Sequence, residues 1–263
     1  MAFDKNHLAP PTFNQKIKGL SAGQLEVLSV QLSKIKHTEM SKYHAYWCFF
    51  LLILISVVNT FQRSTISFMF TFVGSTEEMT YDVHYSIRDA IPDFTNENYA
   101  MMVGDTFTII YAFMVLFTGS ASDIFDRKLL LCGSNFGWCA CMYLSSFCTD
   151  FQQLWVLRLI MSFFTAFSGP CSYSLITDWI PPHQRTMAYS LYALGVQFGG
   201  PIAPLNVHII EWLGWRATFQ FTALIGFVVL ALALLAFDEP ERGKFDISQS
   251  VLVNPDQSLK SGS

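Results

Sequence analysis

Six stretches of this chain are apolar over roughly 20 residues each, and these runs constrain its fold more than any other feature. An α-helix rises about 1.5 Å per residue, so about 20 apolar residues cross a hydrocarbon core about 30 Å thick. We therefore predict an all-α membrane protein with six transmembrane helices. The expected spans cover residues 46–73, 99–121, 129–147, 151–176, 185–210 and 216–237.

The composition agrees with a chain that faces lipid. Of its 263 residues, 52% are hydrophobic and 14% are charged, whereas about a quarter of the residues of a soluble domain are charged. We expect residues 1–44 to form an amino-terminal segment, residues 45–237 the transmembrane bundle and residues 238–263 a polar tail. No cleavable signal peptide is expected, because residues 1–42 contain no apolar core of that type.

An amphipathic helix is expected before the first span, over about residues 22–37. Its apolar residues recur at helical spacing on one face, and they are Leu25, Leu28, Leu32 and Ile35. A helix of this kind lies on a membrane surface, against a partner or back on its own bundle. The pattern does not choose among these positions.

The basic residues predict how the spans are oriented. An even number of spans places both termini on one side, and the segments on that side carry twelve of the Lys and Arg residues, while only Arg88 and Arg216 lie opposite. The positive-inside tendency therefore predicts that both termini are cytosolic, or on the equivalent side of an organelle. The acidic segment 74–98 is expected on the other side.

No pattern in the chain indicates an enzyme, a metal site or a nucleic-acid site. The six cysteines lie within or at the ends of apolar runs and are interpreted as packing residues. The six histidines are scattered, and neither a catalytic motif nor an extended basic stripe occurs. We expect no catalytic residues, no metal, no cofactor and no nucleic-acid partner.

The segment between the second and third spans carries a family motif. Residues 119–128 read G-S-A-S-D-I-F-D-R-K and resemble the G-x-x-x-D-R-x-G-R-K loop of major facilitator transporters. The resemblance assigns Gly119, Asp123 and Arg127 to a charge network that closes the cytosolic gate. Ile124 stands where the family usually has arginine, so this network is altered.

A second element of the same family follows the fourth span. Residues 178–185 read D-W-I-P-P-H-Q-R and resemble the family's D-x-x-P-x-x-x-R element. The resemblance implies that Asp178 pairs with Arg127 and that Arg185 helps to close the same cluster.

The fifth span contains a glycine pattern that is similar to the family's Gly-Pro motif, at which this helix bends. Its residues are Gly195, Gly199, Gly200 and Pro201. Close packing of helices through small residues explains the pattern equally well.

Three short motifs point within the superfamily to spinster-like transporters, which are proposed carriers of sphingolipids, lysolipids and related amphiphiles. Residues 59–63 (N-T-F-Q-R) resemble their N-Y-x-D-R, residues 214–216 match their G-W-R, and residues 239–243 (E-P-E-R-G) resemble their E-P-x-R-G. The resemblance covers about residues 45–245 and implies the amino-terminal six-helix half of a major facilitator fold.

The chain departs from that subfamily at positions that matter for coupling. Gln62 stands where the first-span acid takes and releases the coupling proton, and an amide does not titrate. The subfamily's fourth span reads R-x-x-x-G-x-G-E, whereas this chain keeps Arg158 and has Ser162, Phe164 and Thr165 at the next motif positions. We expect that proton coupling through these positions is lost.

Arg63 and Arg158 remain inside predicted spans, where an unpaired charge costs several kcal/mol. Such residues usually face a cavity or a partner, and these two can share one cavity. Together with Asn59, Gln62 and Thr165 they form the candidate substrate-binding set. The local alternatives are that Arg63 snorkels to the interface and that backbone carbonyls satisfy Arg158.

Three functions follow from these observations. In the first, two copies of the chain, or one copy and a separate second half, build a carrier with a site at the midplane. In the second, the chain is a non-transporting subunit of a larger membrane complex. A carrier of six helices alone is disfavoured, because its inner face would meet lipid. The expected partners are membrane lipid and a second half, a second copy or other membrane subunits.

Overall fold

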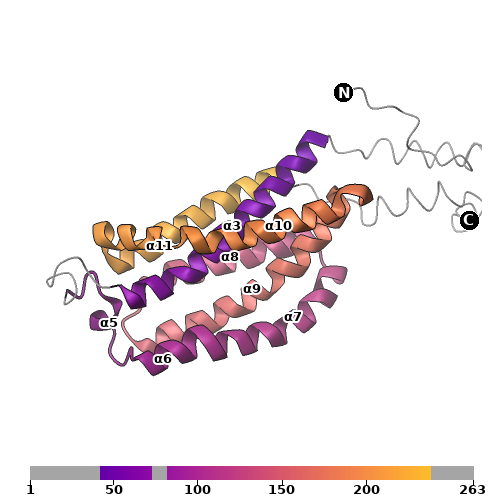
Figure 1. Ribbon diagram of the computed structural model, residues 1–263. Coiled ribbons are helices and arrows are strands. Elements are labelled where there is room, and N and C mark those ends of the chain that lie inside the picture. Colours follow the sequence, from indigo (N-terminus) through magenta and orange to yellow (C-terminus); the bar gives the residue numbers. More distant parts are fainter. Residues whose placement is uncertain (1–41, 73–81, 238–263) are drawn as a thin grey trace, which may run out of the picture.

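The computed structural model describes residues 42–72 and 82–237 (Figure 1). The expected amino-terminal helix, the E-P-E-R-G motif and the polar tail lie outside the described residues. The side chains of Asp105 and Asp123 also lie outside the description.

Long α-helices form the body of the described chain and lie alongside one another (Figure 1). They are α3 (Lys42–Thr71), α7 (Thr106–Ile124), α8 (Arg127–Ser145), α9 (Phe151–Trp179), α10 (Pro182–Ile202) and α11 (Leu205–Ala236). Two short helices, α5 (Ile87–Ala90) and α6 (Asn96–Ala100), follow α3, and a π-helix, η2 (Met101–Asp105), joins α6 to α7. No strand occurs in residues 42–72 or 82–237, so the all-α prediction is confirmed for this part of the chain.

Four helical stretches are long and apolar enough to cross a membrane by length and composition. They are Tyr43–Thr71, Asn96–Ser122, Phe151–Trp179 and Leu205–Ala236. α8 and α10 have the length of a span but contain more small and polar residues. Both pack along neighbouring helices: α8 contacts α9 and α11, while α10 contacts α3 and α9.

The boundary between the last two helices differs from the expected one. α10 ends at Ile202 and α11 begins at Leu205, whereas the sequence predicted a fifth span to residue 210. Pro204 stands in the turn between them, where a residue without an N–H does not interrupt a helix interior. Gly214 lies within α11 as a kink and has a φ of 78°, which favours glycine.

The buried core consists of two clusters, one toward each end of the bundle. The terminal end is the end where α3 begins and α11 ends, and there the Cys48 thiol donates to the Ala236 carbonyl at 3.2 Å. The loop end carries residues 82–95, and its cluster includes Ile87, Phe94 and Trp215. Buried polar side chains lie between the clusters, at the middle of α3.

Two glycines of α10 permit its close contact with α3. A Cβ atom at Gly199 would lie 2.5 Å from the Val57 carbonyl oxygen, and one at Gly195 would lie 2.5 Å from the Cγ2 of Ile53. Gly200 has open space around it. Close packing is therefore confirmed for the first two, while a bend at Gly199, Gly200 and Pro201 stays a prediction.

Candidate functional site

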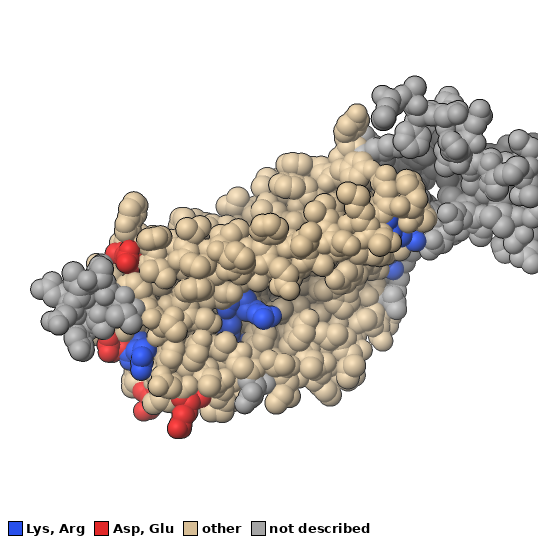
Figure 2. All heavy atoms as spheres, in the orientation of Figure 1, with Lys and Arg blue, Asp and Glu red and all other residues tan. Residues whose placement is uncertain are grey.

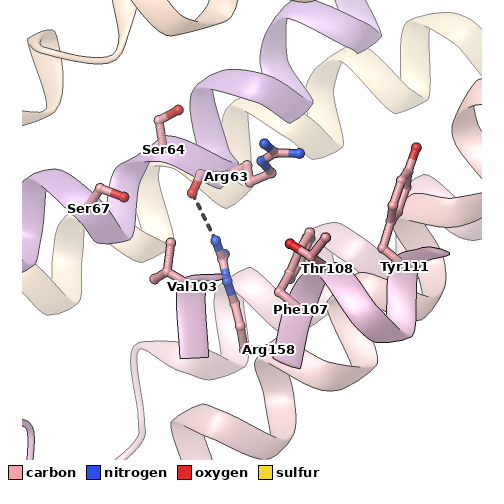
Figure 3. A pocket seen from close by; sticks show the side chains of 8 residues that line it. All are labelled: Arg63, Ser64, Ser67, Val103, Phe107, Thr108, Tyr111 and Arg158. Atoms are coloured by element: carbon pink, nitrogen blue, oxygen red, sulfur yellow. Dashed lines mark hydrogen bonds between the residues drawn. The ribbon is translucent and has the colours of Figure 1, made fainter. Parts of the chain in front are cut away.

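A cavity of about 330 Å³ opens between α3, η2, α7 and α9. Figure 2 shows basic atoms in the middle of a face whose other charged atoms lie toward its two ends. The close view in Figure 3 shows the lining residues, which are Arg63, Ser64, Ser67, Val103, Phe107, Thr108, Tyr111 and Arg158.

Arg158 is the buried cation of this cavity, with an exposed fraction of 3%. Its Nη2 donates a hydrogen bond of 3.0 Å to the backbone carbonyl of Arg63, so a carbonyl satisfies part of the guanidinium, although this carbonyl belongs to the continuous helix α3 and not to a helix break. Its Nε has no hydrogen-bond partner in the described part of the chain. One donor of a deeply buried cation is therefore left without an acceptor.

Arg63 and Arg158 share one aromatic ring. The Arg158 guanidinium carbon lies 5.0 Å from the ring centroid of Phe107, and that of Arg63 lies 5.7 Å from the same centroid. Both contacts fall within the range of cation–π attraction. Among the described side chains, neither arginine forms an ion pair. The structure thus brings two like charges to one cavity without a described carboxylate between them.

Gln62 does not line the cavity, because it is the centre of a junction of three helices. Its Nε2 donates to the Thr222 carbonyl of α11 at 2.6 Å, and its Oε1 accepts from the Trp138 Nε1 of α8 at 2.6 Å. Gly226 makes room for this amide, since a Cβ atom there would lie 2.5 Å from the Nε2 of Gln62. Successive helical residues point about 100° apart, so Gln62 and Arg63 face different neighbours.

Asn59 and Thr165 also lie away from the cavity wall. The Asn59 Nδ2 donates to the Asn135 Oδ1 at 2.9 Å, joining α3 to α8. The Thr165 hydroxyl donates to the Met161 carbonyl at 2.8 Å within α9. Of the five candidate binding residues, the structure therefore brings only Arg63 and Arg158 into one cavity.

Most of the cavity wall was not predicted from the sequence. On α3, Ser64 and Ser67 share a face with Arg63 at helical spacing, which is a signal that could have been read. Phe107 and Tyr111 come from α7, directly after η2, and π-helical turns often occur at functional sites. No pattern in the sequence marks that π-helix.

Phe164, expected where the family has a sliding glycine, interlocks α8 and α9. A Cβ atom at Gly137 of α8 would lie 2.4 Å from the Phe164 ring. The small residue of this contact is therefore on α8 and not on α9, and it leaves room for the Phe164 ring. Sliding of α9 past α8 would require this ring to leave its site.

The residues expected to form the gate network lie at the terminal end, where the structure pairs two of them. Arg127 Nη1 donates to the Asp178 carboxylate in a largely buried ion pair between the start of α8 and the end of α9, as the family resemblance implied. Arg185 donates from Nε to the Ile180 carbonyl at 3.3 Å. Gly119 lies in the last turns of α7 with open space around it, and Asp123 lies outside the described side chains.

Comparison with known proteins places these features in a family. Residues 52–251 match the sequence profile of the Major Facilitator Superfamily. The D-galactonate transporter of Escherichia coli O6:H1 is 33% identical over 119 residues, which are 44% of this chain and 27% of that protein. The sphingosine-1-phosphate transporter SPNS2 of Danio rerio is 27% identical over 183 residues, covering 64% of this chain and 35% of that one.

Two further comparisons concern spinster proteins. Protein spinster homolog 1 of Xenopus tropicalis is 25% identical over 217 residues, which are 80% of this chain and 38% of that protein. The crystal structure of a bacterial homolog to the human lysosomal transporter Spinster has a TM-score of 0.62 at 19% identity, covering 78% of this chain and 45% of that one. The chain thus spans less than half the length of each of these proteins.

Proposed function

Because this chain belongs to the major facilitator superfamily, we propose that it is one half of a transporter whose Arg63–Arg158 cavity binds an anionic solute or amphiphile. It is an integral multi-pass membrane protein that is similar to spinster-like transporters. The observation that carries the proposal is the pair of guanidiniums on one ring, of which Arg158 is buried with an Nε that has no partner in the described chain.

An anion suits this cavity for electrostatic reasons. A buried guanidinium is costly unless it is paired, and its planar fork matches carboxylate and phosphate groups. The hydroxyls of Ser67, Thr108 and Tyr111 add hydrogen-bonding groups to the wall, while Val103 and Phe107 add an apolar side. This combination fits a ligand with an anionic head and an apolar part.

The names of two relatives support an anionic ligand. One is named a D-galactonate transporter and one a sphingosine-1-phosphate transporter, and both of these compounds are anions. The chain spans 27% and 35% of those two proteins, so a second half is part of the proposal.

α7 offers a surface for that second half. Its outward residues are large and apolar, and Ile109, Phe113 and Leu116 are exposed by 67%, 55% and 74%. A side chain of this kind must meet lipid or another protein. The proposed second half covers part of this face and closes the cavity from the side.

Ligand binding tests the proposal directly. The purified protein in lipid nanodiscs would be titrated with D-galactonate and with sphingosine-1-phosphate, and thermal stabilisation would be measured. We expect stabilisation by at least one anion, loss of it in Arg158→Gln, and none from sphingosine, which lacks the phosphate. The variant Lys128→Gln removes a charge from the terminal end and should keep the response. Equal responses in Arg158→Gln and the unchanged protein would defeat the proposal.

The second candidate function is a non-transporting subunit of a membrane complex. Two observations favour it: the Phe164 ring locks α9 onto Gly137 of α8, and Gln62 is fully engaged in a three-helix junction. Gentle purification of the native protein, followed by identification of co-migrating chains, separates the two functions. A stable complex of unrelated membrane subunits, inactive in anion transport, would support the second.

A further inference from the structure

Two aromatic residues lie one helical turn beyond the cavity toward the loop end. Ser67 of α3 lines the cavity, and Phe70 follows it by one turn on the same helix. Val103 of η2 lines the opposite wall, and Tyr99 of α6 precedes it by one turn. Phe70 and Tyr99 therefore stand at the same level, between the cavity and the loop end.

These two rings close against each other. The centroids of Phe70 and Tyr99 are 3.9 Å apart with an interplanar angle of 3°, so the rings stack across the space between α3 and α6. Phe94 meets both rings edge-on, at 5.1 Å and 6.4 Å. The Arg88 guanidinium lies over the Phe70 ring at 4.8 Å. Phe70 is buried in the core cluster of the loop end.

Hydrogen bonds tie the loop to α11, whereas an irregular turn joins the segment that carries Tyr99 to α7. Trp215 holds the loop on α11, since its backbone N–H donates to the His84 carbonyl at 3.2 Å and its Nε1 to the Val83 carbonyl at 3.0 Å. Tyr99 instead sits on the short helix α6, and the π-helix η2 separates it from α7. π-helical turns occur frequently at functional sites, and this one interrupts the regular α-helical backbone between α6 and α7.

We propose that Phe70 and Tyr99 form a lid that closes the Arg63–Arg158 cavity toward the loop end, and that α6 swings on η2 to open it. This proposal rests on the proposed function, because the lid controls access to the cavity in which the anion would bind. Its closure directs ligand entry to the terminal end or to the side of the bundle. When α6 swings out, Tyr99 leaves Phe70 and the cavity opens toward the loop end.

Thiol accessibility tests the lid without any ligand. Ser67→Cys places a thiol in the cavity beneath the stack, while the six natural cysteines are buried and serve as the background measured in the unchanged protein. A charged, membrane-impermeant thiosulfonate is added to sealed vesicles on the side of the loop end. We expect slow labelling of Ser67→Cys, at least tenfold faster labelling when Phe70→Leu or Tyr99→Leu is added, and slow labelling with Tyr99→Phe, which keeps the stack.

The matched control is Phe113→Leu. Phe113 forms an edge-to-face pair with Phe117 on α7, with ring centroids 5.1 Å apart. The substitution therefore removes an aromatic contact of a similar kind at a position away from the lid. Leucine is chosen because it keeps most of the apolar volume of the ring, which favours folding. Size-exclusion profiles verify that every variant folds. Labelling of Ser67→Cys at the rate of an exposed thiol at Asp89→Cys, or no acceleration in the leucine variants, would overturn the lid.

The outcome is independent of the proposed ligand. If anions fail to bind and labelling still depends on the stack, the lid stands and the anion proposal falls. If anions bind through Arg158 and the labelling rate of Ser67→Cys is the same with and without the stack, the anion proposal stands and the lid is refuted.

Discussion

Trp138 donates a hydrogen bond of 2.6 Å from its Nε1 to the Oε1 of Gln62, so a side chain of α8 determines which way the amide of α3 points. The Nε2 of the same amide then meets the Thr222 carbonyl at 2.6 Å. Gln62 is completely buried at this junction. Position 62 needs one acceptor and one donor, and a carboxylate supplies only acceptors.

The first prediction follows from this requirement. Gln62→Glu should be less stable than the unchanged protein by about 1–3 kcal/mol at pH 8, because the carboxylate leaves the Thr222 carbonyl without its donor and places a charge beside it. The loss should shrink at pH 5, where the protonated carboxyl donates again. Thermal unfolding in detergent at the two pH values measures this.

Gln62→Met is its control, because it removes both hydrogen bonds without adding a titratable group. Its destabilisation should be the same at both pH values. A Gln62→Glu protein whose unfolding follows pH no more than that of Gln62→Met would contradict the proposed donor role.

Transport, where it occurs, should not be driven by a proton on the first span, because Gln62 does not titrate. The measurement is uptake into reconstituted vesicles with and without an imposed pH gradient. The variant Asp105→Asn tests whether the carboxylate at the end of η2 carries a coupling proton instead. Gradient-driven uptake that survives replacement of every intramembrane carboxylate, yet vanishes in Gln62→Ala, would be incompatible with this prediction.

Gly199→Ala should destabilise the bundle by about 1–3 kcal/mol, the usual range for overpacking. Its new Cβ atom would lie 2.5 Å from the Val57 carbonyl oxygen, so α10 would have to move away from α3. Gly200→Ala is the matched control, because open space surrounds that position. Equal unfolding temperatures for the two variants would show that the contact of α10 with α3 is looser than described.

Both termini should lie on the side of the cytosol or its organellar equivalent, with the loop end on the other side. Cysteines at positions 85 and 255 report the two sides when an impermeant thiol reagent is added to intact vesicles. We expect each to react from one side only, and from opposite sides. Labelling of both from the same side would rule out the six-span topology.

The chain should not exist as a free monomer in a mild detergent. Its buried Arg158, the exposed face of α7 and the gate motif near Asp123 all call for a neighbouring helix or a lipid headgroup. Native mass measurement should give a species larger than one chain. A stable, folded species of one chain's mass, unchanged in Arg63→Leu and Asp123→Ala, would refute this.

The pairing of Arg127 with Asp178 shows what family resemblance can predict. The two residues are far apart in the chain, and no hydrophobic pattern or spacing in the sequence links them. The contact is implied because each residue belongs to a motif of the same family. The structure contains the expected pair. The same resemblance predicted a helical membrane fold of this family. Four described stretches have the length and apolarity of spans, and the fold matches that of a bacterial spinster homolog.

By itself, the sequence determined that the chain crosses a membrane as helices, because apolar runs of span length leave no other way to satisfy the backbone. It also placed Arg63 and Arg158 inside those helices. Only the tertiary structure decided that these two share Phe107 while Gln62, one residue from Arg63, faces α8 and α11. Which residues meet depends on the rotation of each helix about its axis. That rotation is determined by distant contacts, such as Gly199 against Val57 and the ring of Phe164 against Gly137, and not by the local pattern.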